Sequence, residues 1–137
     1  MAPAPTEVQT DVPELVFAAP LLGLEHLSRF ALVQLDPDGP LFTLQSLEDP
    51  EVELVVLAPV VGSFGDYAPE LDALTLAAVG ATRREDVLLL VVVTVGPTLA
   101  ESTANLLAPV VVHATTGRAA QSVLTGSTYP LRAPLAP

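Results

Sequence analysis

The side chains that could act in acid–base or nucleophilic chemistry are few in this sequence. It contains two histidines, His26 and His113, and no cysteine. Neither histidine has the spacing of a metal-binding motif, and the missing cysteine excludes disulfides, thiolate nucleophiles and cysteine-ligated metals. No glycine-rich phosphate loop and no Gly-x-Ser-x-Gly motif is present, and a nucleophilic serine would need a neighbouring base. We therefore predict no catalytic site, no metal and no cofactor.

Paired carboxylates are the remaining chemical possibility, because two of them can act as acid and base in glycoside hydrolysis. The acidic residues are concentrated in predicted turns, where solvated carboxylates are the ordinary expectation: Asp36, Asp38, Glu48, Asp49 and Glu51. Sugar-binding clefts also tend to use aromatic side chains, and this chain has no Trp, two Tyr and four Phe. A carboxylate-dependent hydrolase would need two buried carboxyl groups that face each other in a cleft, and that alternative stays open here.

The charge balance is the strongest global signal. Sixteen acidic residues stand against five arginines and no lysine, and the formal net charge is −11. Such a surface repels nucleic-acid phosphates, so we do not expect direct nucleic-acid binding. Two interpretations of the acidity remain. It keeps a chain with 50% apolar residues soluble, or it complements a basic partner protein.

Short runs of Val, Leu and Thr separated by Pro, Gly and Asp predict strands joined by turns. The predicted strands are residues 15–17, 30–35, 41–46, 52–57, 87–95, 109–114 and 119–124. Residues 36–40 have turn chemistry and should join two of them in a hairpin. A helix is predicted over residues 66–80, with Leu71, Leu74 and Ala78 on one face and Gly80 just past its end.

These elements predict a mostly β fold: a small antiparallel β-barrel-like single domain over residues 1–137, with one short helix. We expect residues 1–11 and 133–137 to fray. Residues 87–93 are apolar without alternation, so either the predicted helix covers the outer face of this strand or part of that face is an open docking patch. The longest apolar run, residues 87–95, is shorter than the roughly 20 residues of a membrane-spanning helix. We predict no membrane anchor and a cytoplasmic protein.

Four segments, taken together and in register, resemble the FliW family of flagellar assembly factors. They are residues 41–51 (LFTLQSLEDPE) continuing into 55–59 (VVLAP), residues 67–71 (YAPEL), residues 103–112 (TANLLAPVVV), and Gln121, Val123 and Leu124 followed by 129–132 (YPLR). The resemblance spans roughly residues 12 to 135. The N-terminal loop departs from the family pattern at Ala18, Pro20 and Leu24.

The resemblance implies a small barrel-like factor without enzymatic activity. Proteins of this family bind CsrA, an RNA-binding translational repressor, and also bind flagellin. Flagellin that accumulates sequesters the factor and frees CsrA, which then represses flagellin synthesis; exported flagellin releases the factor to bind CsrA again. The expected function is therefore relief of CsrA repression by partner exchange. The alternative is an export chaperone that binds flagellin through an apolar face without antagonising CsrA.

The candidate partner-binding residues lie in the matching segments. Glu48, Asp49 and Glu51 share a turn and could meet arginines of a basic partner. The other candidates are Asn105, Tyr129 and Arg132. All three also have a structural interpretation, because Asn105 can bridge backbone groups and the other two can lay amphipathic stems over the edge of the barrel.

Overall fold

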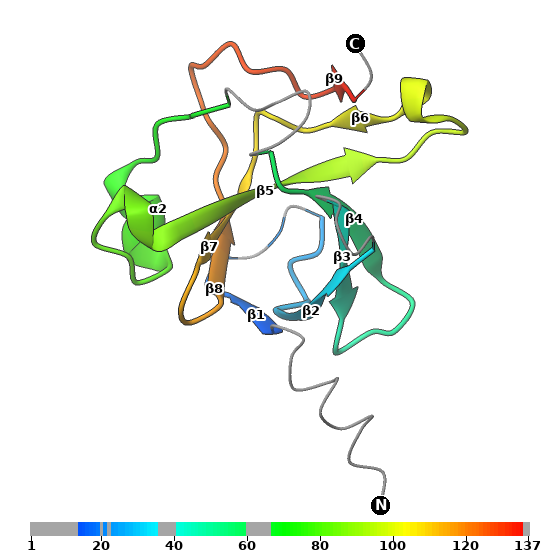
Figure 1. Ribbon diagram of the computed structural model, residues 1–137. Coiled ribbons are helices and arrows are strands. Elements are labelled where there is room, and N and C mark those ends of the chain that lie inside the picture. Colours follow the sequence, from blue (N-terminus) through cyan, green and yellow to red (C-terminus); the bar gives the residue numbers. More distant parts are fainter. Residues whose placement is uncertain (1–13, 20, 22, 36–40, 60–66, 136–137) are drawn as a thin grey trace, which may run out of the picture.

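A computed structural model describes residues 14–19, 21, 23–35, 41–59 and 67–135 of the chain. Within this part of the chain the fold is mostly β (Figure 1). The strands are β1 (Glu14–Phe17), β2 (Arg29–Gln34), β3 (Leu41–Ser46), β4 (Glu53–Leu57), β5 (Val87–Thr94), β6 (Thr103–Ala104), β7 (Val110–His113), β8 (Arg118–Gln121) and β9 (Ala133–Pro134). One α-helix, α2 (Ala73–Ala78), and two short 3₁₀ turns, η2 (Arg84–Asp86) and η3 (Leu99–Glu101), complete the described elements.

The strands close into a barrel. The sheet order is β4-β3-β2-β1-β8-β7-β5, and a further pairing of β4 with β5 closes the ring, while β6 and β9 extend from β5. Most pairs are antiparallel, as predicted, but β1 runs parallel to β8. A ring with an odd number of strands cannot alternate direction all the way round, so one pair must be parallel. The predicted mostly β, barrel-like fold with one short helix is confirmed.

The barrel interior is filled by aliphatic side chains around two aromatic rings. Phe30 is fully buried, together with Leu44 and Val56 from the two following strands. The Phe17 and Phe30 rings pack edge to face with centroids 5.5 Å apart. This arrangement is favoured by the charge distribution of aromatic rings, and burial of these side chains supplies most of the stabilisation of the barrel.

The outer face of β5 is covered by two different segments. Val87 and Leu89 pack beneath the end of α2 and the residues after it, as the first of the two predicted alternatives has it. Val91 and Val93 pack instead against residues 104–106 and 129–135. The helix therefore covers only the first half of the strand, and the chain's own C-terminal segment covers the second half.

Helix α2 is shorter than the predicted range of 66–80. The Asp72 side chain accepts a hydrogen bond from the Thr75 N–H at 2.8 Å and starts the helix there, while Gly80 has a φ of 76° just past its end. The predicted apolar face was wrong at Leu74, which is 82% exposed. Leu71 and Ala78 do pack against the core as predicted, and Leu76 packs there in place of Leu74, because Leu71 precedes the helix and so does not set which face turns inward. Residue 66 lies outside the described residues.

The predicted hairpin between residues 30–35 and 41–46 is confirmed as antiparallel β2 and β3, and its turn at 36–40 lies outside the described residues. The C-terminal prediction needs a correction. Ala133 and Pro134 form β9, which pairs with β6, and Ala133 is buried. The burial of Ala133 and the pairing of β9 with β6 order this segment, which was predicted to fray. Residues 1–11, 136 and 137 lie outside the described residues.

Candidate partner-binding surface

The turn between β3 and β4 holds three of the predicted partner-binding residues in a defined conformation. The Ser46 hydroxyl accepts hydrogen bonds from the Glu48 N–H at 3.1 Å and the Asp49 N–H at 2.9 Å. One carboxylate oxygen of Asp49 accepts the Glu51 N–H at 3.1 Å. Side chains that bond their own backbone in this way are typical of tight turns. The turn predicted at residues 48–51 is confirmed.

Glu48 also reaches across to the neighbouring strand. Its Oε1 accepts the backbone N–H groups of Ser28 at 2.7 Å and Arg29 at 3.0 Å. These two hydrogen bonds favour the ionised carboxylate and lower the pKa of Glu48. Glu48 thus joins the β3–β4 turn to the start of β2, a structural role that the sequence pattern did not reveal.

Further carboxylates lie around this turn, and we call the group Glu14, Glu25, Glu48, Asp49 and Glu51 the acidic end. Glu14 pairs with the Arg29 guanidinium at 2.7 Å, and this hydrogen bond lowers the pKa of the Glu14 carboxyl. Glu25 accepts the Gly23 N–H at 3.0 Å, which lowers the pKa of Glu25. Arg29 and His26 are the basic side chains that interact electrostatically with Glu48. Since the acidic end has five carboxylates, it keeps an excess of negative charge.

The Glu48 contacts predict an acid-sensitive element. Because the pKa of Glu48 is lower in the folded chain than its ordinary 4.5, its contribution to stability is present above that value. The contribution is lost as the pH falls through the folded-state pKa. Urea unfolding between about pH 6 and about pH 3 should therefore show a weaker pH dependence in Glu48→Gln than in the wild type. Glu51→Gln is the control, and equal pH slopes in wild type and E48Q would contradict the assignment.

Asn105 acts as a backbone bridge within the chain. Its Oδ1 accepts the N–H groups of Leu107 and Ala108, both at 3.0 Å, in the turn that leads into β7. The prediction that this side chain bridges backbone groups is confirmed. A role of Asn105 in partner binding stays a prediction.

Asn105→Ala should leave two backbone N–H groups without their acceptor. We expect a loss of about 1–2 kcal/mol in the free energy of unfolding, measured by urea denaturation. Asn105→Asp keeps the Oδ1 acceptor and is the matched control, with a smaller loss expected. Equal losses in the two variants would show that the acceptor is not what Asn105 contributes.

Tyr129 lies next to the segment that contains Asn105. Its ring packs edge to face against Tyr67, with centroids 4.9 Å apart, and the Tyr67 hydroxyl donates to the Leu106 carbonyl at 2.5 Å. Burial raises the pKa of Tyr67. Arg132 is exposed, and no hydrogen bond or ion pair holds its side chain within the described residues.

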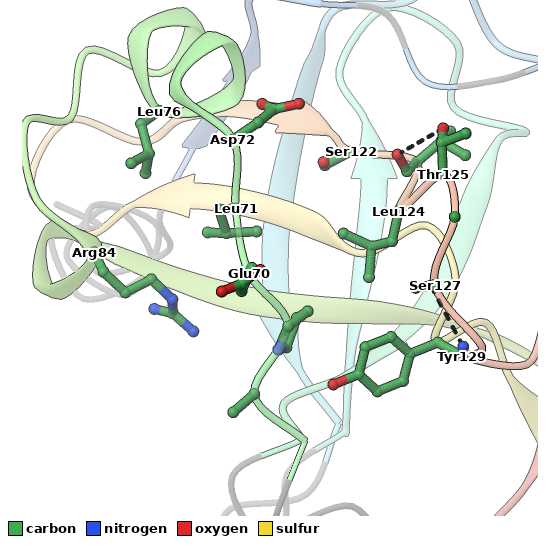
Figure 2. Close-up of a pocket in the computed structure, with 14 residues that line it drawn as sticks. Glu70, Leu71, Asp72, Leu76, Arg84, Ser122, Leu124, Thr125, Ser127 and Tyr129 are labelled. Atoms are coloured by element: carbon green, nitrogen blue, oxygen red, sulfur yellow. Dashed lines mark hydrogen bonds between the residues drawn. The ribbon is translucent and has the colours of Figure 1, made fainter.

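A groove of about 1110 Å³ runs beside Tyr129, between residues 68–72 and residues 122–127. Figure 2 shows the Tyr129 ring at one end of this groove, with Leu71 on one wall and Leu124 on the other. A hydrogen bond of 3.2 Å from the Thr75 hydroxyl to the Ser122 hydroxyl ties helix α2 to the opposite wall. The groove is therefore a feature of the folded chain whose walls are fixed to each other.

The structure divides the predicted partner-binding residues between two places. Glu48, Asp49 and Glu51 share the β3–β4 turn, whereas Asn105 and Tyr129 belong to segments joined by a hydrogen bond of 3.1 Å from the Leu106 N–H to the Pro130 carbonyl. In Figure 1 the β3–β4 turn lies at the lower right and α2 lies at the left.

Sequence reasoning missed several residues of these surfaces: Glu14 and Glu25 at the acidic end, and Glu70 and Val123 in the groove. Glu70 and Val123 stand in segments that carry the family resemblance, which was the available signal. Glu14 gave no signal, because its place at the acidic end depends on the pairing of β1 with β2.

A metal site and a buried carboxylate pair are the two chemical arrangements that the described residues can reveal. Among them, no group of three or more His, Asp or Glu side chains is placed to hold a metal ion. No Asp or Glu in the described ranges is buried, so the facing buried pair that a carboxylate-dependent hydrolase needs is not found there. The only α-helix of the described chain is too short to cross a membrane.

Comparison with known proteins agrees with this fold. The family model described as "FliW protein" matches residues 4–135. The flagellar assembly factor FliW of Syntrophotalea carbinolica is 40% identical over 131 residues, which cover 94% of this chain and 91% of the relative. That of Bacillus licheniformis is 33% identical over 130 residues, covering 95% and 90%. A crystal structure of the flagellar assembly factor FliW superposes with a TM-score of 0.83 at 31% identity, covering 94% of this chain and 88% of that one. This chain therefore belongs to the FliW family of flagellar assembly factors.

Proposed function

We propose that this flagellar assembly factor works by binding, in the cytoplasm and without catalysis, to the translational regulator CsrA. Binding relieves the repression of flagellin synthesis, and flagellin displaces CsrA from the factor when it accumulates. The observation that carries this proposal is the uncompensated negative charge of the surface, which suits a basic partner. The resemblance to FliW proteins supplies the identity of the two partners.

The charge is uncompensated because sixteen acidic residues stand against five arginines, and most of the arginines contact groups outside the acidic end. Arg29 pairs with Glu14 and Arg83 with Asp86. The guanidinium of Arg84 donates to the Val87 carbonyl, and that of Arg118 donates to the Ala78 carbonyl at the end of α2. Few cations are thus left to neutralise the acidic end.

This charge provides a mechanism for relieving repression. A protein that binds RNA presents basic residues to the phosphates, and an acidic body docked beside them repels RNA without filling its site. Complementary fields also speed the encounter of the two proteins and disfavour acidic competitors. The quantity that governs exchange is the coupling free energy between CsrA and flagellin binding.

Charge reversal at the acidic end tests the proposal. The double variant Asp49→Lys and Glu51→Lys keeps the hydrogen bonds of Ser46 and Glu48 in the turn and loses the exposed one from the Glu51 N–H to Asp49, and circular dichroism checks that it folds. We expect its association with CsrA to be slowed roughly tenfold at low salt and to lose most of its dependence on salt concentration. Stopped-flow or surface-plasmon measurements over a salt series give both quantities.

Glu85→Lys is the control, because Glu85 is an exposed carboxylate in η2 and is not part of the acidic end. An association rate of the double variant that equals that of the control at every salt concentration would contradict the acidic end as the docking surface. RNA binding by the CsrA complex at low salt is the second measurement. RNA affinity equal to that of free CsrA would refute electrostatic exclusion.

The alternative function is an export chaperone that binds flagellin but does not antagonise CsrA. The aliphatic side chains Leu71, Leu76 and Leu124 in the lining of the groove favour this second candidate, since a chaperone of this kind would use an apolar face. Pull-downs with CsrA and flagellin from the same organism separate the two functions. Capture of flagellin alone supports the chaperone, and capture of both proteins supports exchange.

A further inference from the structure

Strands β6 and β9 lie outside the closed ring of the barrel. The ring runs from β4 through β3, β2, β1, β8 and β7 to β5 and closes by the pairing of β5 with β4. Strand β6 pairs with the end of β5, and among the described strands β9 pairs with β6 alone. Figure 1 shows β6 and β9 beside each other at the top of the view. Strand β9 can therefore leave β6 without breaking any pairing of the ring.

Residues 129–135, which we call the strap, are joined by hydrogen bonds to the segment around β6. The Leu106 N–H donates to the Pro130 carbonyl, and the Leu135 N–H donates to the Ser102 carbonyl, both at 3.1 Å. The two-residue pairing of β9 with β6 lies between these two bonds in the strap. Since the partners of all these contacts are β6 and its immediate neighbours, the contacts can break together while the ring stays closed.

The strap buries little side-chain surface of its own. Ala133 is buried and contributes only a methyl group, whereas Leu131 and Arg132 beside it are exposed. A hollow of about 250 Å³ lies between Leu135 and the outer faces of β3, β4 and β5, so the end of the strap is incompletely packed. Segments with few buried contacts open locally at a lower free energy than the core of a domain.

An exposed turn precedes the strap and can act as its hinge. Residues 125–128 are all exposed, and nothing lies within 4 Å of a Cβ added at Gly126. The strap makes its first tertiary ring contact at Tyr129, whose ring packs edge to face against Tyr67. A change of backbone angles in this turn would carry the strap away from the barrel with little steric hindrance.

We propose that the strap opens and closes as one unit on an intact barrel. Opening uncovers the backbone edge of β6 and the second half of β5, where Val91 and Val93 are buried in the closed state. It also removes Tyr129 from the end of the groove beside α2. The strap is thus a conformational device that controls access to a strand edge and an apolar face, and its opening requires neither of the proposed partners.

Hydrogen exchange of the unmodified chain tests this at two adjacent amides. The Asn105 N–H donates to the Val92 carbonyl of β5, whereas the Leu106 N–H donates to the strap. After correction for intrinsic rates, we expect Leu106 and Leu135 to exchange at least about tenfold faster than Asn105 and at similar rates to each other, because one opening exposes both. NMR gives each rate. Equal protection of Leu106 and Asn105 would overturn the proposal, and so would Leu135 exchanging far faster than Leu106, since the end would then fray by itself.

A disulfide between β6 and β9 should hold the strap closed. Thr103 and Pro134 face each other next to the hydrogen-bonded pair of Ser102 and Leu135, and such pairs alternate with non-hydrogen-bonded ones along antiparallel strands. A non-hydrogen-bonded pair has a short Cα separation that a disulfide can span. The chain has no cysteine of its own, so Thr103→Cys with Pro134→Cys can form this bond alone. Oxidation should slow exchange of the Leu106 N–H at least about tenfold relative to the reduced form, and an unchanged rate would contradict opening of the strap.

Thiol labelling measures exposure of the buried side of the strap. Ala133→Cys places a thiol in the strap, and Ala119→Cys is the matched control at a buried alanine of β8 within the ring. We expect a thiol reagent to label A133C at least about 100-fold faster than A119C in native buffer and at the same rate in concentrated urea. Circular dichroism checks that both variants are folded. Equal labelling rates in native buffer would mean that the strap opens only when the whole barrel unfolds, which overturns the proposal.

Discussion

Phe30→Ala is expected to lower the free energy of unfolding by about 3–5 kcal/mol, because it empties the centre of the barrel. Phe30 has no exposed surface, and its ring packs edge to face against Phe17. The cavity is surrounded by Leu44 and Val56 on paired strands of a closed ring, which limits how far the walls can collapse into it. A loss of this size is a large fraction of the 5–15 kcal/mol that stabilises a typical domain.

Urea denaturation followed by circular dichroism measures this effect. Val33→Ala is the control from the same strand, where the side chain is 39% exposed and a loss below about 1 kcal/mol is expected. A similar loss in both variants would mean that the interior of β2 contributes no more to stability than its outer face.

The strands were predictable because their sequences carry a local signal. Short apolar runs bounded by Pro, Gly and Asp mark β2, β3 and β4. The turn at residues 48–51 was predictable because its side chains are of the types that hydrogen-bond the local backbone. The predicted helix failed at Leu74 for the opposite reason. Its apolar spacing fits a helix, but the Asp72 cap sets where the helix begins, and only the packed structure shows which face is covered.

The candidate surfaces depend on contacts between distant parts of the chain, so the sequence predicted their residues only in part. Glu48 was expected to contact a partner, yet its carboxylate binds the N–H groups of Ser28 and Arg29 about 20 residues away. The groove brings residues 68–72 against residues 122–127. No local periodicity reports such a juxtaposition, and this is also why the parallel pairing of β1 with β8 could not be predicted.

The same parallel pair links the acidic end to the groove. Strand β1 begins at Glu14 of the acidic end, and β8 is followed directly by Ser122 of the groove. The two strands are joined by hydrogen bonds from the Val16 N–H to the Gly117 carbonyl at 3.0 Å and from the Ala18 N–H to the Ala119 carbonyl at 2.8 Å. This seam is the one parallel pair in the ring of described strands.

Gly117→Ala should disrupt this seam. Gly117 has a φ of 78°, a region that side chains rarely adopt, and an added Cβ would lie 2.4 Å from the Glu14 carbonyl oxygen. The Cβ cannot be accommodated without moving β1 away from β8, because the contacted atom belongs to the backbone. We expect a loss of about 2–5 kcal/mol from the combined backbone strain and steric overlap.

Gly126→Ala separates these two causes. Gly126 has a similar φ of 86°, but nothing lies within 4 Å of an added Cβ, so only the conformational cost of about 1–2 kcal/mol should appear. Urea denaturation of the two variants gives the difference directly. If G117A loses no more stability than G126A, the strands move apart at little cost and the parallel seam is not a rigid closure of the barrel. A larger loss in G117A is the expected result, because the Glu14 carbonyl oxygen blocks the added Cβ.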